Sequence, residues 1–90
     1  MPESSEATIT LAGDLHARPA GALSVAAAKF DSAVELTVGA NQANAKSVLA
    51  VMQLGASSGQ QITVRAIGPD ASDAVATMIG ILTGATKAGD

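Results

Sequence analysis

The fold of this 90-residue chain is organised around Asp14-Leu15-His16-Ala17-Arg18-Pro19-Ala20, where a loop passes into the first predicted helix. Pro19 fits the first turn of a helix, because its φ is already helical and its missing N–H needs no partner there. His16 is the only histidine of the chain, and it then falls at or beside the helix N-cap, two residues before Arg18. The sequence therefore places one imidazole at the mouth of a helix.

Such a helix end is suited to holding a phosphate group. Its partial positive charge and free N–H groups attract anions, and we expect the N–H groups of Ala17, Arg18 and Ala20 to point outward. Arg18 can add a forked pair of donors to the phosphate oxygens. An imidazole titrates near neutral pH, so its nucleophilic neutral form is available. The stretch predicts a reversible phosphoryl carrier, but the spacing alone leaves open a surface histidine without chemistry.

The segments around this helix predict a four-stranded antiparallel sheet with three helices on one face. Apolar and polar residues alternate over residues 7–11, 34–38 and 62–66, and a weaker edge strand is expected at 43–45 after a turn at 39–42. Alternation indicates that one face of the sheet is covered and the other is wet. The order strand-helix-strand-strand-helix-strand-helix fits this arrangement.

The expected helices have recognisable apolar stripes and starts. Gly21 within the first helix either admits a close neighbour or is simply tolerated. Ser47 should cap a short second helix that closes at Gly55, and Asp70 should cap the last one. A single domain is expected over residues 1–90, with loose tails at 1–6 and 85–90 and a loosening of the chain from Gly84. The two predicted stripes comprise Ala20, Leu23, Ala27 and Phe30 in the first helix, and Ala71, Val75, Met78 and Leu82 in the last.

The composition argues against several classes of function. Five Lys and Arg against eight Asp and Glu give a net charge of −3, and Phe30 is the only aromatic residue, so nucleic-acid binding is not expected. One histidine and no cysteine make a conventional metal site improbable. The acidic N-terminus and the lack of a long apolar run predict neither a signal peptide nor membrane insertion. We expect a cytoplasmic protein without cofactor or metal.

Two stretches resemble a known family. Leu15-His16-Ala17-Arg18-Pro19-Ala20 resembles the active-site signature of HPr, the histidine-containing phosphocarriers of the bacterial sugar phosphotransferase system. Lys46-Ser47-Val48-Leu49-Ala50-Val51-Met52-Gln53-Leu54-Gly55 resembles the regulatory-serine signature of that family, at a similar separation. The order of elements agrees along nearly the whole chain. The resemblance implies an α+β open-faced β-sandwich, with a four-stranded antiparallel sheet and three helices on one face.

The resemblance also implies a function. His16 would accept a phosphoryl group on Nδ1 from enzyme I, which draws it from phosphoenolpyruvate, and would pass it to a sugar-specific enzyme IIA. Arg18 and the backbone N–H groups of Ala17 and Arg18 would hold the phosphate. The protein would be a monomeric carrier that shares the catalytic machinery of its partners, not a stand-alone enzyme. No paired carboxylates, nucleophile–base pair or cofactor loop is found that would favour a free-standing enzyme.

Ser47 and a few apolar residues are the other candidate sites. In many family members the matching serine is phosphorylated by HPr kinase/phosphorylase and signals to a transcriptional regulator, whereas the residue type alone indicates an N-cap. One alternative is therefore a regulatory module acting mainly through phospho-Ser47. Another is a carrier for a specialised branch, such as fructose transport or dihydroxyacetone phosphorylation. The residues expected to dock partners beside His16 are Ala20, Val48, Leu49 and Met52.

The sequence departs from the family at two kinds of position. Asp14 stands where the family usually has glycine, and an acidic side chain beside the imidazole is expected to repel phosphate. Gly13 can supply the backbone freedom instead. Val25 and Ala50 stand where the family often has lysines, so electrostatic steering of partners should be weaker than in a lysine-rich relative. The remaining basic contacts are expected to be Arg18, Lys29 and Lys46.

Overall fold

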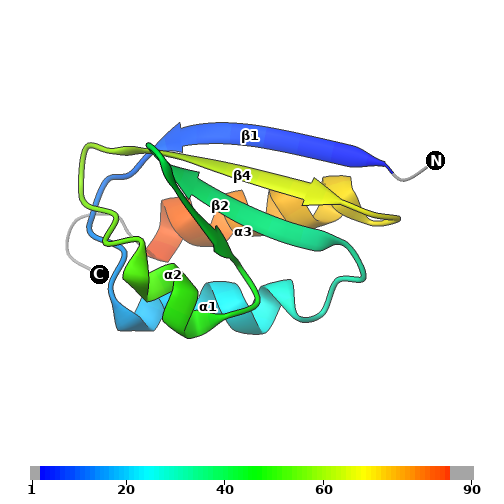
Figure 1. The fold of residues 1–90 in the computed structure, drawn as a ribbon, viewed down its shortest axis with the longest axis horizontal. Coiled ribbons are helices and arrows are strands. Elements are labelled where there is room, and N and C mark those ends of the chain that lie inside the picture. The colour runs from blue at the N-terminus through cyan, green and yellow to red at the C-terminus, as the bar shows by residue number, and fades with distance from the viewer. Residues whose placement is uncertain (1–2, 86–90) are drawn as a thin grey trace.

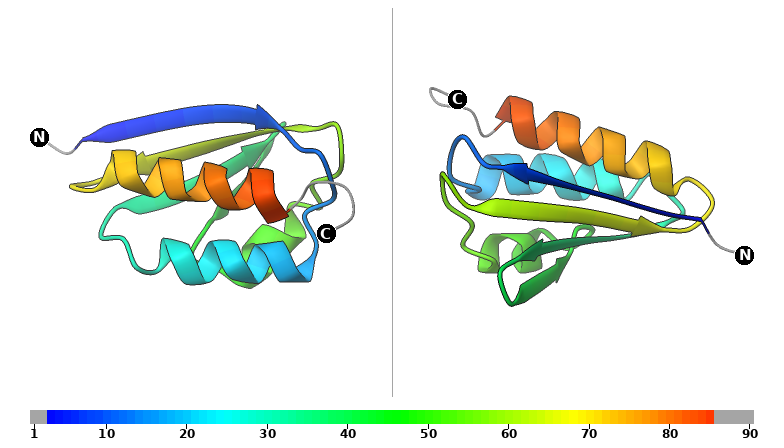
Figure 2. Two further views of the ribbon diagram at one scale, coloured as in Figure 1. Left: turned by 180° about the vertical axis from the view of Figure 1, so that it is seen from behind. Right: turned by 90° about the horizontal axis from the view of Figure 1, so that it is seen from above.

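The computed structural model describes residues 3–85, which form a four-stranded antiparallel sheet covered on one face by three helices (Figures 1 and 2). The strands lie in the order β1-β4-β2-β3, and the other face of the sheet is open. The predicted open-faced sandwich is confirmed. Along the chain the elements are β1 (Ser4–Thr10), α1 (Ala17–Ala27), β2 (Ala33–Val38), β3 (Asn41–Asn44), α2 (Val48–Gln53), β4 (Gln61–Ile67) and α3 (Ala71–Ala85).

Alternation along the strands produces the two different faces of the sheet. The central strands β2 and β4 send Val34, Leu36, Val38, Ile62, Val64 and Ala66 into the core beneath the helices. Residues between them face outward, and Thr8 and Thr63, which are direct partners on β1 and β4, share a hydrogen bond of 2.8 Å between their hydroxyl oxygens. The period of two therefore predicted the covered and wet faces correctly.

The starts of β1 and β3 differ most from the sequence-based expectation. Residues 4–6 were expected in a loose tail, but they belong to β1, where Ser4 pairs with Ile67 and Glu6 with Arg65. The polar sequence of residues 41–44 was expected to be partly turn, but it forms β3 on β2, with Val38 opposite Asn41. The turn is confined to Gly39 and Ala40. Main-chain pairing decides both cases, because neither segment carries a strong apolar pattern.

The helices confirm the two apolar stripes with one exception. The exposed fractions of Leu23, Met78 and Leu82 are all 0 %, so these side chains fill the layer between helices and sheet. Phe30 was expected on the first stripe, but α1 ends at Ala27, and the ring packs half-buried against the core from the following turn. The predicted loosening at residues 84–85 is wrong, since α3 runs to Ala85; residues 86–90 lie outside the described part. Over the described residues, no helix has the length and apolarity to span a membrane.

Asp70 connects two loops at one end of the sandwich. It occupies the N-cap position of α3 as expected, and its carbonyl accepts a hydrogen bond from the Ala74 N–H at 3.0 Å, but its carboxylate bonds to the α1–β2 turn and not to the helix. One carboxylate oxygen accepts hydrogen bonds from the Ser32 N–H (2.9 Å) and hydroxyl (2.5 Å), and the other accepts from the Asp31 N–H (3.0 Å). The Asp70 N–H in turn donates to the Ser32 hydroxyl at 3.2 Å. The side chain thus fixes the α1–β2 turn against the start of α3.

We predict that this cluster makes stability depend on acid pH. The Ser32 hydroxyl, followed by the backbone N–H donors, lowers the pKa of Asp70 below its ordinary value of 3.8. A carboxylate with a lowered pKa stabilises the folded state above the ordinary pKa, and this contribution disappears as pH falls through the lowered value. Urea unfolding of wild type and Asp70→Asn should show a stability difference that is constant near neutral pH and shrinks in acid. A difference independent of pH would contradict the assignment.

Candidate functional site

His16 occupies the N-cap position of α1, as the sequence predicted. Its backbone is extended, with φ −93° and ψ −168°, and its side chain makes no capping hydrogen bond to the helix. The imidazole is exposed rather than packed into the core. A ring that is accessible and not used to cap the helix can meet a partner protein directly.

The end of α1 places donors for an anion next to this ring. Ala17 and Arg18 are the first two helical residues, so their N–H groups have no acceptor within the helix. The Ala20 N–H was also expected to point out of the helix end. This expectation is wrong, because the Ala20 N–H donates to the His16 carbonyl at 3.1 Å and closes the first turn. Pro19 has no N–H, and its ring is buried beneath the helix end. The Arg18 side chain is exposed on the same helix end.

The α2–β4 loop holds the segment before His16. Leu15 is buried, and its N–H donates to the Ala56 carbonyl at 2.9 Å. Leu11 pairs with the same loop in both directions, donating to the Gln60 carbonyl (2.9 Å) and accepting from the Gly59 N–H (2.8 Å). The approach to the helix is therefore a paired segment, not a free loop. Sequence analysis missed this partner loop because main-chain hydrogen bonds leave no signature in side chains.

Ser47 is the N-cap of α2, which confirms the interpretation made from its residue type. Its hydroxyl accepts a hydrogen bond from the Ala50 N–H at 3.2 Å, and the residue is half-buried. Beside it, the Lys46 ammonium donates to the Phe30 carbonyl, just beyond the C-terminal end of α1, at 2.9 Å. Ser47 therefore lies near the opposite end of α1 from His16. The structure does not bring the two residues into one site.

The proposed docking residues separate into exposed and buried ones. Leu49 is 64 % exposed, and Val48 and Met52 are 43 % exposed, so all three present apolar surface on α2. Ala20 was also expected to dock partners, but its exposed fraction is 0 % because it faces the core from α1, so it cannot be a surface contact. Val25, 64 % exposed on α1, is an apolar surface residue that sequence analysis did not include among the docking residues.

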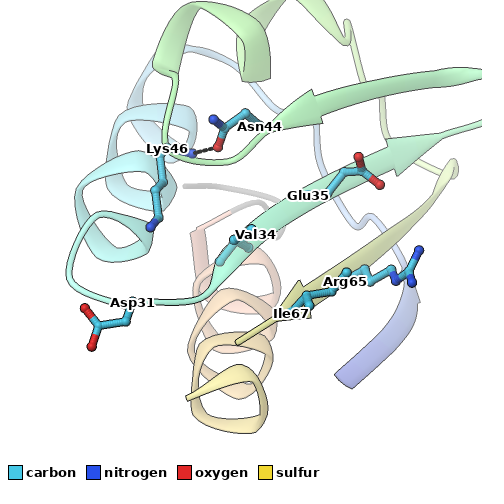
Figure 3. A pocket seen from close by; sticks show the side chains of 8 residues that line it. Asp31, Val34, Glu35, Asn44, Lys46, Arg65 and Ile67 are labelled. Atoms are coloured by element: carbon cyan, nitrogen blue, oxygen red, sulfur yellow. Dashed lines mark hydrogen bonds between the residues drawn. The ribbon is translucent and has the colours of Figure 1, made fainter. Parts of the chain in front are cut away.

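A hollow of about 490 Å³ lies away from His16, between the α1–β2 turn and the neighbouring parts of β2, β3 and β4 (Figure 3). Its lining includes Asp31, Val34, Lys46, Arg65 and Ile67. The charged groups do not converge on a common point, because in Figure 3 the Asp31 carboxylate and the Arg65 guanidinium point to opposite sides. The Lys46 ammonium already donates to a carbonyl group. This hollow is separate from the candidate phosphate site.

An exposed N-cap histidine two residues before an exposed arginine, on a sandwich with one open face, matches the arrangement predicted for a phosphoryl-carrier protein. The sequence profile of the HPr family, described as the PTS HPr component phosphorylation site, matches residues 3–83. The chain therefore belongs to the HPr family of phosphocarriers of the phosphotransferase system, which confirms the resemblance seen in its motifs. This family works with the enzymes of that system.

Solved structures of similar proteins agree with this assignment. A mycoplasma histidine-containing phosphocarrier protein is 35 % identical with a TM-score of 0.77, covering 88 % of this chain and 90 % of that chain. HPr from Bacillus anthracis str. Ames is 26 % identical with a TM-score of 0.78, covering 91 % and 98 %. Crh, a Bacillus subtilis catabolite repression protein described as a domain-swapped dimer, is 32 % identical with a TM-score of 0.71, covering 82 % and 85 %.

Proposed function

We propose that His16 accepts a phosphoryl group from phospho-enzyme I and passes it to an enzyme IIA of the sugar phosphotransferase system. The observation that carries this proposal is the position of His16, exposed at the N-cap of α1 without a capping bond. The family assignment supports the same role. The protein then works in the cytoplasm as a monomeric carrier, and needs no cofactor of its own.

The transfer requires one bond to form as another breaks. The lone pair of Nδ1 on neutral His16 attacks phosphorus, and the bond between phosphorus and enzyme I breaks while its electrons stay with enzyme I. The N–H groups of Ala17 and Arg18 and the Arg18 guanidinium face the developing negative charge and stabilise it. Delivery to enzyme IIA is the same step in reverse, with a nucleophile of that partner attacking phosphorus.

The apolar surface of α2 supports a docking role. Val48, Leu49 and Met52 form a patch that no other described part of the chain covers, since each is at least 43 % exposed. The methionine side chain adapts to differently shaped partners, which a carrier must meet in turn. The short run from α2 through Gly55 to Ala56 ends against Leu15, so this patch is connected directly to the segment that holds His16.

A labelling experiment tests the proposal. The purified protein is incubated with enzyme I and labelled phosphoenolpyruvate, and then with an enzyme IIA. We expect acid-labile label on the peptide that contains His16, followed by its loss to enzyme IIA. Ser47→Ala is the matched control and should be labelled at His16 as well as wild type. Absence of label with enzyme I from several bacteria, or an acid-stable label, would contradict the proposal.

Regulation at Ser47 is a second role that the position of the residue favours. A phosphate there would lie at the N-terminal end of α2, where negative charge is tolerated, and next to the exposed Val48 and Leu49. It would add about two negative charges to the docking surface. HPr kinase/phosphorylase would supply the phosphate, and a transcriptional regulator would bind the product. An acid-stable phosphoserine on Ser47 in cell extracts is the expected observation.

A further inference from the structure

Asp14 makes an unexpected contact in the segment that leads to His16. Its exposed side chain was expected to repel phosphate, but its carboxylate accepts a hydrogen bond from the Ser58 N–H at 2.9 Å. The Ser58 hydroxyl donates in turn to the Ala12 carbonyl at 3.1 Å. The two bonds join the α2–β4 loop to both sides of Gly13. The Asp14 carboxylate therefore helps to attach the segment before His16 to the α2–β4 loop.

These bonds complete the attachment of the segment before α1. Leu11 and Leu15 are already paired with the α2–β4 loop through main-chain hydrogen bonds. Between them, residues 12–14 have no regular secondary structure, and Gly13 adds freedom to the backbone. Asp14 is the residue of this interval whose side chain reaches across to the facing loop. Without that bond, residues 13 and 14 would be held only through the Ser58 hydroxyl at Ala12 on one side and through Leu15 on the other.

We propose that Asp14 is a positioning residue, whose hydrogen bond to the Ser58 N–H holds His16 at the helix N-cap for phosphoryl transfer. This inference rests on the proposed function of His16. The carboxylate works as an acceptor, so its hydrogen bond matters more than its charge. A nucleophile that must meet phosphorus in line tolerates little misplacement, and even small displacements slow such reactions strongly. At the position before Leu15, Asp14 thus provides a side chain whose place is fixed by the Ser58 N–H.

Two substitutions at Asp14 separate the hydrogen bond from the charge. Asp14→Ala removes both, and we expect kcat for phosphorylation by enzyme I to fall about tenfold. Asp14→Asn keeps an acceptor oxygen for the Ser58 N–H and removes the charge, so it should retain most of the wild-type kcat. KM should stay unchanged in both variants, because the docking patch lies on α2. Asp73→Asn, which removes an exposed charge from α3, is the control and should behave as wild type.

Hydrogen exchange provides a readout that does not depend on enzyme I. The Ser58 amide should exchange slowly in wild type and Asp14→Asn, and faster in Asp14→Ala. Equal loss of kcat in both variants would assign the effect to charge, and would overturn the proposal. It would also fail if Asp14→Ala kept its full kcat or changed only KM. Wild-type protein that accepts no label would instead refute the proposed function, while the exchange measurement would still report on the bond to Ser58.

Discussion

His16→Ala is expected to abolish acid-labile labelling by enzyme I and phosphoenolpyruvate, to below one part in about a thousand of the wild-type rate. Among the described residues 15–20, no other side chain can serve as the nucleophile, because a guanidinium group only donates hydrogen bonds and Leu15, Ala17, Pro19 and Ala20 are apolar. The variant should fold normally. The imidazole is exposed and caps nothing, so the free energy of unfolding should change by no more than about 0.5 kcal/mol.

Two measurements on the same sample make this result interpretable. Urea unfolding establishes that His16→Ala is folded, and transfer kinetics in a mixture with wild type establish that it still binds enzyme I. We expect the variant to inhibit wild-type labelling competitively, because the docking patch of α2 is intact. Residual acid-labile label on His16→Ala would identify a different acceptor and refute the assignment of the phosphoryl group to His16.

Gly68→Ala should be among the most destabilising single substitutions in the chain. Gly68 has φ +147°, a conformation that residues with a Cβ rarely adopt. An added Cβ would also lie 2.6 Å from the Cα of Ser32, whose exposed fraction is 0 %. Backbone strain and steric overlap together are expected to cost about 3 kcal/mol or more. The displaced Ser32 would also weaken its hydrogen bonds to Asp70.

Gly21→Ala is the matched control for that substitution. Gly21 lies within α1, and an added Cβ there meets nothing within 4 Å, so the structure gives no support to a close approach inside the molecule. A helix-interior alanine is preferred over glycine, and we expect a gain of up to about 1 kcal/mol in the free energy of unfolding. Denaturant unfolding of both variants is the measurement. Similar destabilisation by the two would mean that the crowding at Ser32 does not decide the outcome.

Much of this fold could be predicted because its strands and helices carry strong periodic patterns. The alternation of Val34, Leu36 and Val38 specified a covered face, and the spacing of Val75, Met78 and Leu82 specified the buried side of α3. The predictions failed where pairing, not side-chain pattern, decides the structure. β3 and the first residues of β1 are polar, and they become strands because β2 and β4 offer hydrogen-bond partners.

The candidate site divides in the same way. The position of His16 at a helix N-cap followed from local signals, namely Pro19 in the first turn and the apolar stripe of the helix. The contacts that involve distant residues did not follow. Asp70 stands at the N-cap position as predicted, but its carboxylate binds the turn at Ser32, and Asp14 was expected only to repel phosphate. A side chain with one local and one remote option cannot be assigned from sequence spacing alone.

The attachment of α1 at both ends has a consequence for how partner enzymes distinguish phosphorylated from unphosphorylated carriers. Leu15 and Asp14 are bonded to the α2–β4 loop before the helix, and the Phe30 carbonyl is bonded to Lys46 after it. We expect a helix held in this way to keep its place whether or not His16 carries phosphate, so loaded and empty carriers have the same outline. If the proposed function holds, each partner enzyme would have to recognise the phosphate itself, and carriers without phosphate would compete with phosphorylated ones for the same docking surfaces. Under the proposed function, the ratio of the two forms, and not only the total amount of protein, would then set the rate of phosphoryl transfer.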